Sequence, residues 1–358
     1  MIKTLSLLAA VLVCLAVYLI VWPVPVRPVA WEAPEDAGYT QEFIQNDRLA
    51  ALELIDLGGR IGPEDADIGP DGLIYVPSHN GEILRIGTDG SVELFAQTDG
   101  RPLGLEFAPD GTLYVADAYR GLLAIDQLGK VTFLTNQVED GSPVLYADDV
   151  DIAADGSIYF SDASTRFGAE ANGGTLAASV LDLVEHSASG RILKFDPVSG
   201  KTTVFAAGLN FANGVAINDE STAVFVVETG VYRVWRFPMD GGEGRVILDN
   251  LPGFPDNINP ASDGTFWVGL VSPRNAIMDK LSGNTFLRRV IMRLPDVMKP
   301  APTRYGFILR MDADGRIIET LQDPTGSYAL TTGAVTLSDG RVVVTSLTEP
   351  ALGLLQQD

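Results

Sequence analysis

Residues 108–117 read APDGTLYVAD, an Asp-Gly turn followed at once by a short strand-forming run. Asp-Gly favours a tight hairpin because glycine accepts a positive φ angle and aspartate tolerates one. The unit recurs along the chain, with a short apolar strand before each turn and a β-rich strand after it. Its six turns are Asp71-Gly72, Asp110-Gly111, Asp155-Gly156, Glu220-Ser221, Asp263-Gly264 and Asp339-Gly340.

Each unit continues with two further strand-like runs, such as Glu82–Ile86 and Val92–Ala96 in the first. Six four-stranded units at intervals of about 40–50 residues predict an all-β fold, a six-bladed β-propeller over residues 50–358. The spare strand at Ala51–Leu57 is expected to pair into the last unit and close the ring. Two separate β-sandwiches are a weaker alternative, because no linker interrupts the repeat.

The composition limits what the protein can bind. Asp and Glu total 47 against 25 Lys and Arg, a net charge of −22, which repels phosphate backbones and argues against nucleic acid as a partner. One cysteine excludes an internal disulfide framework and a Cys-based zinc site, and two histidines make a His-rich metal site improbable. Any metal would therefore be held by oxygen.

The N-terminus carries an apolar run from Leu5 to Trp22, 18 residues without a charge. That length is enough for a transmembrane helix, so residues 1–22 are interpreted as an uncleaved signal anchor. The alternative is a cleaved signal peptide, but no small-residue cleavage site is evident. Lys3 favours a cytoplasmic N-terminus with a translocated propeller, a single-pass membrane protein, and Cys14 is interpreted as an apolar residue of the helix. The Pro-rich residues 23–49 are expected to form an extended linker.

Equivalent positions of a propeller lie around the mouth of its central tunnel. Counting seven residues back from the six turns gives Glu64, Leu103, Asp148, Asn213, Asp256 and Thr332. Carboxylates that converge there repel one another, no Lys or Arg is evidently placed to neutralise them, and burying unpaired charge is costly. A divalent cation solves this problem, and an all-oxygen set favours calcium, with Asn257 as a fifth ligand. The alternatives are a solvated acidic mouth or Asp and Asn residues that cap turns.

Several runs resemble the strictosidine synthase-like family, over essentially the whole propeller. They are GRPLGL at 100–105, YVADAY at 114–119, FANGV at 211–215 and the more specific PGFPDNI at 252–258. The chain is more distantly similar to the gluconolactonase, diisopropyl fluorophosphatase and paraoxonase propellers, which are calcium-dependent hydrolases with the metal at the tunnel mouth.

The resemblance implies one calcium at the mouth, and its metal ligands fall on Glu64, Asp148, Asn213, Asp256 and, as in paraoxonases, Asn257. At Asp148 the relatives usually have Asn, so the extra carboxylate should tighten calcium binding and make the ion a weaker Lewis acid. Paraoxonases hold a second, structural calcium, and Asp65 and Asp149 match two of its ligands. The catalytic Glu of strictosidine synthase would align near Gly333-Ala334, where no carboxylate stands.

The function predicted from these residues is a membrane-anchored, calcium-dependent hydrolase of lactones or aryl esters. Asp256 is the candidate base or nucleophile, or a ligand only; His186 is a candidate catalytic group over the site; Arg101 is a candidate substrate-binding residue. His79 is interpreted as a hairpin residue, and surface pairing with Asp99 is the alternative for Arg101. A non-catalytic binding scaffold with structural calcium is the alternative function, and a strictosidine synthase-like condensing enzyme is a third, less favoured one.

Two long insertions, 163–190 and 272–306, follow second strands and are expected to form lids over the mouth. The second insertion mixes basic and apolar residues, a composition typical of a helix at a membrane surface. The alternative is a helix docked on its own propeller. The basic residues of this insertion are Arg274, Lys280, Arg288, Arg289, Arg293, Lys299 and Arg304; its apolar ones are Ile277, Met278, Leu281, Phe286, Leu287, Val290, Ile291, Met292 and Leu294.

Overall fold

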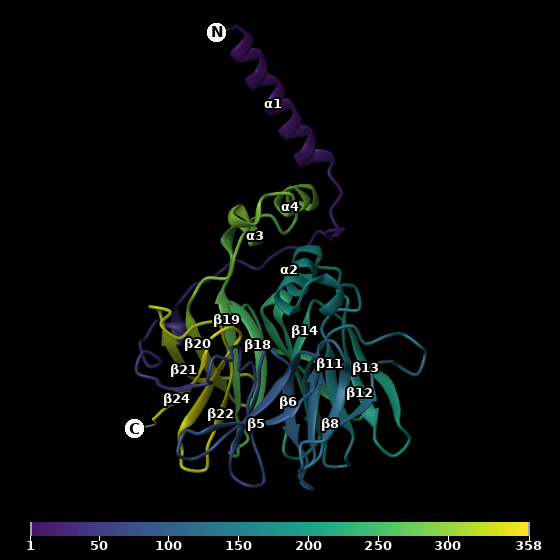
Figure 1. Cartoon of the computed structure of the whole chain (residues 1–358), viewed down its shortest axis with the longest axis vertical. Helices are drawn as coiled ribbons and strands as arrows, with labels where there is room; N and C mark the ends of the chain where they lie inside the picture. Colours follow the sequence, from purple (N-terminus) through teal and green to yellow (C-terminus); the bar gives the residue numbers. More distant parts are fainter. Residues whose placement is uncertain (1, 357–358) are drawn as a thin grey trace.

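The computed structural model describes residues 2–356, which form six four-stranded antiparallel sheets arranged around a central axis (Figure 1). The sequence-based prediction of a six-bladed β-propeller is thus confirmed. The first three blades are β2 Asp67–Ile68, β3 Ile74–Pro77, β4 Glu82–Ile86, β5 Val92–Gln97; β6 Pro102–Phe107, β7 Leu113–Asp117, β8 Gly121–Ile125, β9 Val131–Thr135; and β10 Ala147–Ile152, β11 Ile158–Asp162, β12 Gly190–Asp196, β13 Lys201–Leu209.

The remaining blades follow the same order from the axis outward, except that the last one takes its outer strand from the other end of the chain. They are β14 Ala212–Ile217, β15 Ala223–Glu228, β16 Arg233–Pro238, β17 Arg245–Leu248; β18 Gly253–Pro260, β19 Phe266–Pro273, β20 Gly306–Met311, β21 Ile317–Asp323; and β22 Thr331–Thr336, β23 Val342–Ser346, β24 Ala351–Leu355, β1 Glu53–Asp56.

The strand near residues 51–57 closes the ring by pairing into the last blade, as predicted from the sequence. β1 pairs antiparallel with β24, from Glu53 opposite Leu354 to Asp56 opposite Ala351. This pairing covers one edge of each strand and joins the two ends of the propeller.

The Asp-Gly turns act through both residues. The carboxylate of Asp110 accepts a hydrogen bond of 2.9 Å from the backbone N–H of Thr112, and Asp155 accepts one of the same length from Ser157. Gly111 adopts a φ angle of 85°, which glycine reaches without steric cost. In the blades that have an Asp-Gly turn, the turn chemistry therefore fixes the register of the first two strands, and so the position of the residues that precede them.

Buried carboxylates also connect neighbouring blades near the axis. Asp65 accepts from the backbone N–H of Leu105 in the next blade at 3.0 Å, and Asp149 accepts from that of Val215 at 2.7 Å. Such bonds satisfy strand N–H groups that face the tunnel and have no partner within their own sheet. They hold the first strands of adjacent blades in register.

Both insertions rise from the same end of the propeller, beside the N-terminal helix (Figure 1). Insertion 163–190, the first lid, contains η2 Glu170–Asn172 and α2 Thr175–Glu185. Insertion 272–306, the second lid, contains α3 Ala276–Lys280, α4 Thr285–Met292 and η4 Asp296–Met298; the short η3 Thr229–Val231 lies in the fourth blade.

Helix α1 spans Ile2–Val21, and its segment Thr4–Val21 has the length and mean hydropathy of 2.7 of a candidate membrane span. None of this segment is buried against the rest of the protein. The side chain of Lys3, on which the predicted orientation depends, lies outside the described part of the structure.

The linker contains only the short helix η1 Gln41–Phe43 among the described residues, and it differs from a free spacer because it is bound to the lids and the propeller. The N–H of Val29 donates to the carbonyl of Glu185 at 2.8 Å, and that of Trp31 donates to Ser282 at 3.3 Å. Leu49 is buried in the propeller. The linker therefore forms part of the structure around the tunnel mouth.

Candidate functional site

The four polar ring residues meet at one end of the tunnel. Glu64 precedes β2, and Asp148, Asn213 and Asp256 lie in the innermost strands β10, β14 and β18. All four are buried, and all four line the same pocket of about 170 Å³, as does Leu103 of the second blade. Residues spread over about 190 positions of sequence thus share one site because each has the equivalent place in its blade.

Four oxygen atoms at this site are buried without a hydrogen-bond partner in the described structure. Three belong to residues that line the pocket: Oε2 of Glu64, Oδ2 of Asp148 and Oδ1 of Asn213. The fourth is Oδ1 of Asn257, which is not among the described residues that line the pocket. A buried polar atom left unsatisfied costs about 1–3 kcal/mol, and more when it carries charge. Such a cluster of acceptors without donors indicates that a cationic or donor group completes the site.

The two carboxamides are held so that their oxygens stay free. Nδ2 of Asn213 donates to Oδ1 of Asp256, and Nδ2 of Asn257 donates to the backbone carbonyl of Glu64 at 2.9 Å. That carbonyl also accepts from Oγ1 of Thr332 at 2.5 Å. With their nitrogens committed to acceptors, both Oδ1 atoms remain available as ligands.

The carboxylates of the site resist ionisation. Burial raises the pKa of Glu64 well above its usual range, and the charges of Asp148 and Asp256 raise it further. Burial and Asp256 do the same to Asp148, and burial raises the pKa of Asp256 to about 7. A positive charge in the site would therefore be strongly favoured, because it would stabilise the ionised forms.

The possible metal ligands of this site are not carboxylates alone. Among the described residues, no group of three or more His, Cys, Asp or Glu side chains is arranged to hold a metal ion. The set defined by the free oxygens is instead mixed, with carboxylates and the carboxamides of Asn213 and Asn257 together. Oxygen ligands of both kinds suit a hard cation and not a soft one.

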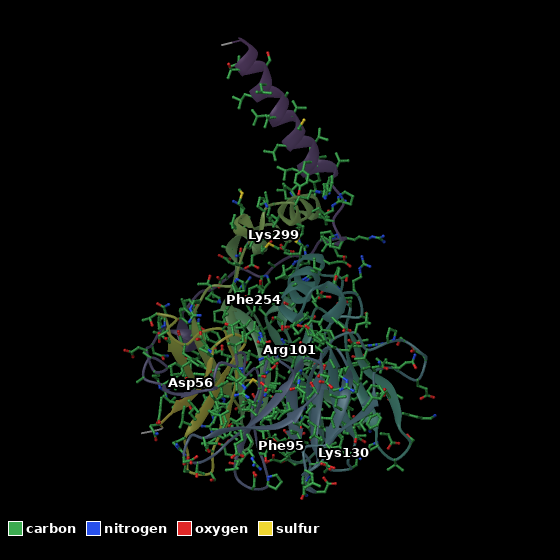
Figure 2. The ribbon with its side chains drawn as sticks, viewed as in Figure 1. Asp56, Phe95, Arg101, Lys130, Phe254 and Lys299 are labelled. Carbon is green, nitrogen blue, oxygen red and sulfur yellow. The ribbon has the colours of Figure 1, made fainter. Side chains whose placement is uncertain are left out.

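Arg101 corrects the expectation that no basic residue lies near the ring. It is buried at the start of the second blade (Figure 2), and Nη1 donates to the carbonyl of Pro102 at 2.8 Å. Its Nη2 has no hydrogen-bond partner among the described residues. Its charge lowers the pKa of Glu64 and of Asp148. Three carboxylates, those of Glu64, Asp148 and Asp256, and one guanidinium leave two negative charges when all are ionised. Arg101 is not among the described residues that line the pocket. The predicted alternative, a surface pair with Asp99, is absent from the described structure, where the guanidinium is buried and donates to Pro102.

His186 is not among the described pocket-lining residues either. It ends α2 in the left-handed conformation, with φ of 55°, and its ring stacks on Trp31 with centroids 4.1 Å apart. Trp31 itself lines the pocket, so the histidine lies behind the linker. Burial lowers the pKa of His186 to about 3, so the ring is neutral at ordinary pH.

His79, interpreted from sequence as a hairpin residue, lies between β3 and β4, with Nε2 2.8 Å from the carbonyl oxygen of Leu347. Burial lowers its pKa to about 4. His79 therefore links the first blade to the last one, where the ring closes, and has a structural role.

The lids were predicted from sequence, but Tyr146 and the wall residues of the first lid and of the linker were not. Tyr146 is buried, lines the pocket, and has a pKa raised by burial and by Asp148 and Glu64. Its position two residues before Asp148 places both side chains on the same side of the chain, and this spacing could have identified it. The walls above the ring come from both lids and the linker, with Leu176, Val180, Leu183, Met278, Ile291, Met292 and Trp31.

A second layer of carboxylates lies three residues further along the same strands. Asp67, Glu106 and Asp151 occupy equivalent places in the first three blades. Burial raises the pKa of Asp67 and of Asp151 to about 7, and that of Glu106 well above its usual range, with Asp67 and Asp151 raising it further. Counting four residues back from the first three turns, in place of seven, would have identified these carboxylates from the sequence.

The residues matched to a second calcium are already satisfied. Asp65 accepts from Leu105 N–H and from Nδ2 of Asn259 at 2.8 Å. Asp149 accepts from Val215 and from its neighbour Val150, also at 2.8 Å. Both oxygens of each carboxylate thus have donors, unlike the free oxygens of the ring.

Fold and site together define a six-bladed propeller with an acidic, two-lidded tunnel mouth. A family model described as strictosidine synthase matches residues 148–242, and one described as strictosidine synthase-like, N-terminal, matches residues 42–86. Human adipocyte plasma membrane-associated protein is 32% identical over 333 residues, which cover 86% of this chain and 78% of the relative. The chain belongs to the strictosidine synthase-like family.

Solved structures show the same architecture at low identity. A gluconolactonase from Xanthomonas campestris has a TM-score of 0.62 at 16% identity, covering 92% of this chain and 96% of that one. Regucalcin from Agrobacterium tumefaciens, described as a calcium-binding protein, has a TM-score of 0.60 at 17% identity, covering 85% and 93%. These similarities support the fold and leave the activity to be argued from the site.

Proposed function

We propose that this protein is a membrane-anchored, calcium-dependent hydrolase of lactones or aryl esters. The observation that carries the proposal is the set of free, buried oxygens on Glu64, Asp148, Asn213 and Asn257. Together with Asp256 they supply the all-oxygen, carboxylate-rich ligands that calcium prefers. One Arg against three carboxylates leaves the two negative charges that a divalent cation would balance.

A bound calcium would supply an electrophile for an ester or lactone carbonyl oxygen and for the negative charge that develops on it. The residues perform the remaining steps. Asp256, which lines the pocket and has a raised pKa, would accept a proton from water or attack as a nucleophile. Asn213 orients that carboxylate through its Nδ2.

The apolar walls favour substrates with a hydrophobic body. Side chains of both lids, such as Leu183, Ile291 and Met292, face the pocket above the polar ring. They would exclude water and hold an acyl or aryl group, while the ring contacts the carbonyl. Gluconolactonase among the structural neighbours fits this class of reaction.

A condensing enzyme of the strictosidine synthase type is not favoured. Gly333 of β22 stands near the place to which the resemblance assigned the catalytic Glu, and a Cβ there would lie 2.5 Å from Oδ1 of Asn259. No space exists at this position for a glutamate without rearrangement, so the proton transfer of that reaction has no corresponding group there.

A non-catalytic scaffold with structural calcium is the second candidate. Asp148 supplies a carboxylate where the related hydrolases usually have a carboxamide. Additional negative charge would bind the cation more tightly and reduce its power to polarise a carbonyl. The regucalcin neighbour, described as calcium-binding, is compatible with either function.

The helix α1 and the membrane association in the relative's name support anchoring. We place the N-terminus in the cytoplasm and the propeller on the extracytoplasmic side. In sealed vesicles whose outer surface is the extracytoplasmic side, an added protease should then cleave the propeller; protection that is lost only when detergent opens the membrane would contradict this orientation.

The function is tested on the full chain in detergent or lipid, with a panel of lactones and aryl esters. Hydrolysis should vanish with chelator and return with calcium. Asp148→Asn should weaken calcium binding by about tenfold or more, whereas Asp140→Asn, in an exposed turn before the same strand, should not. Calcium-dependent thermal stabilisation without hydrolysis of any substrate would favour the scaffold, and no effect of calcium at all would contradict both functions.

A further inference from the structure

Helix α4 of the second lid buries one of its two arginines and exposes two large apolar side chains. Arg288 is 1% exposed, while Phe286 and Leu287 are 44% and 38% exposed. A helix on the surface of a soluble protein has the opposite arrangement, with apolar residues toward the core and charges toward water. The outward face of α4 therefore combines exposed apolar side chains with the exposed, basic Arg289.

The buried position of Arg288 is stabilised by specific hydrogen bonds. Nη1 of Arg288 donates to the carbonyls of Val29 at 2.7 Å and Ser282 at 3.1 Å, and Nη2 donates to Val184. The guanidinium thereby joins the linker, the second lid and the first lid. With Arg288 directed inward, Phe286, which is two residues earlier and about 200° around the helix, faces outward. Leu287 is partly exposed beside it.

Other apolar side chains of the same segment are also exposed. Ile277 of α3 is 60% exposed, and Val297 and Met298 of η4 are 95% and 63% exposed. Single exposed apolar residues are ordinary on a protein surface, but five on one segment of 22 residues, from Ile277 to Met298, mark an interaction site. Two exposed basic residues, Lys280 and Arg289, lie among them.

The second lid is attached to the end of α1. Nε of Arg293 donates to the carbonyl of Trp22 at 2.5 Å, and Nη1 donates to that of Leu19 at 3.1 Å. Figure 1 shows α3 and α4 between the propeller and the lower end of α1. If α1 crosses a bilayer, this lid lies at the level where the helix leaves it.

We infer that the outer face of residues 276–298 binds the lipid surface of the bilayer that α1 enters. Ile277, Phe286, Leu287, Val297 and Met298 insert among the acyl chains near the headgroups, and Lys280 and Arg289 contact anionic headgroups. The inference rests on the anchoring part of the proposed function and is independent of hydrolysis. Met278, Ile291 and Met292 of the same segment line the pocket, so substrates dissolved in the bilayer would reach it directly.

The test uses the full chain with Cys14→Ser, reconstituted in vesicles of phosphatidylcholine with some phosphatidylserine. An environment-sensitive fluorophore is attached at Val297→Cys or, in a second variant, at Phe286→Cys. Part of the phosphatidylcholine carries a nitroxide quencher near the headgroup end of its acyl chain. Leu128→Cys, equally exposed at 92% in the turn that holds Lys130 at the far end of the propeller (Figure 2), is the matched control.

Labels at 297 and 286 should be quenched several-fold more strongly than the label at 128. Equal quenching at all three positions would overturn the inference. Protection of positions 297 and 286 from aqueous iodide without quenching by lipid would also overturn it, because a protein would then cover this face. Neither readout requires turnover, so a failure here is distinguishable from a failure of the proposed hydrolase.

Discussion

The guanidinium of Arg288 donates to the carbonyl oxygen of Val29 at 2.7 Å, although 259 positions separate the two residues. This bond fixes the linker that descends from α1 between the two lids. Trp31, two residues further along, lines the pocket and supports His186. The wall of the site is therefore assembled from parts of the chain that no local pattern connects.

Arg288→Met should release the second lid. It removes the donor from several buried carbonyls, at a cost of about 1–3 kcal/mol for each one left unsatisfied. Limited proteolysis should then cut within residues 272–306, while the melting temperature of the propeller changes little. Arg289→Met, next to it and exposed, is the control; the same cleavage pattern in both variants and in the native protein would show that Arg288 does not hold the lid.

Asp256→Asn should lower kcat by about 100-fold or more even at saturating calcium, because an amide cannot accept the proton or attack as a carboxylate does. An oxygen ligand remains, so calcium binding should weaken less than activity falls. If excess calcium restores the native rate, Asp256 is a ligand only.

His186→Phe should leave the rate and its pH profile nearly unchanged. The phenyl ring can keep the stack on Trp31, and burial already lowers the pKa of the histidine to about 3, so no imidazolium is lost at neutral pH. A general base contributes about 100-fold or more to a rate. A loss of that size, with a disappearing limb of the pH profile, would restore His186 to a catalytic role.

Glu106→Gln should change how stability depends on pH. Burial raises the pKa of Asp67 and Asp151 to about 7 in the folded protein, against about 4 in the unfolded chain. The folded state therefore binds more protons between about pH 4 and pH 7, and the free energy of unfolding falls as the pH rises through this window.

Removing the neighbouring Glu106 charge should raise the free energy of unfolding at about pH 8 and make that free energy fall less steeply with pH. The increase should be only ~1 kcal/mol, because Glu106 and Asp67 are partly exposed to solvent. Urea unfolding in the presence of chelator, over a series of pH values, measures both effects. Glu139→Gln, on an exposed turn, is the control. Parallel curves for native protein and Glu106→Gln would show that this carboxylate layer does not determine the pH response.

The sequence identified the propeller and the ring for the same reason. Asp-Gly turns mark the blades, and a fixed count from each turn finds Glu64, Asp148, Asn213 and Asp256, because symmetry converts equal positions in the repeat into neighbours in space. The second layer at Asp67, Glu106 and Asp151 obeys the same rule.

Side-chain direction could not be obtained in this way. Arg101 lies next to the ring, as its position in the repeat suggested, but the side chain is buried among the carboxylates and does not line the pocket. Composition identified the second lid as basic and apolar, yet could not show that Arg288 points inward and Phe286 outward. These orientations depend on partners such as Val29 and Val184, which lie far away in the chain.

The calcium site is tested most directly by a crystal of this protein grown with calcium and examined for anomalous scattering from the ion. If calcium binds as proposed, one peak should lie at the tunnel mouth, about 2.3–2.6 Å from side-chain oxygens of Glu64, Asp148, Asn213, Asp256 and Asn257. No peak there at millimolar calcium, with the free oxygens bound only to water or to Arg101, would contradict it.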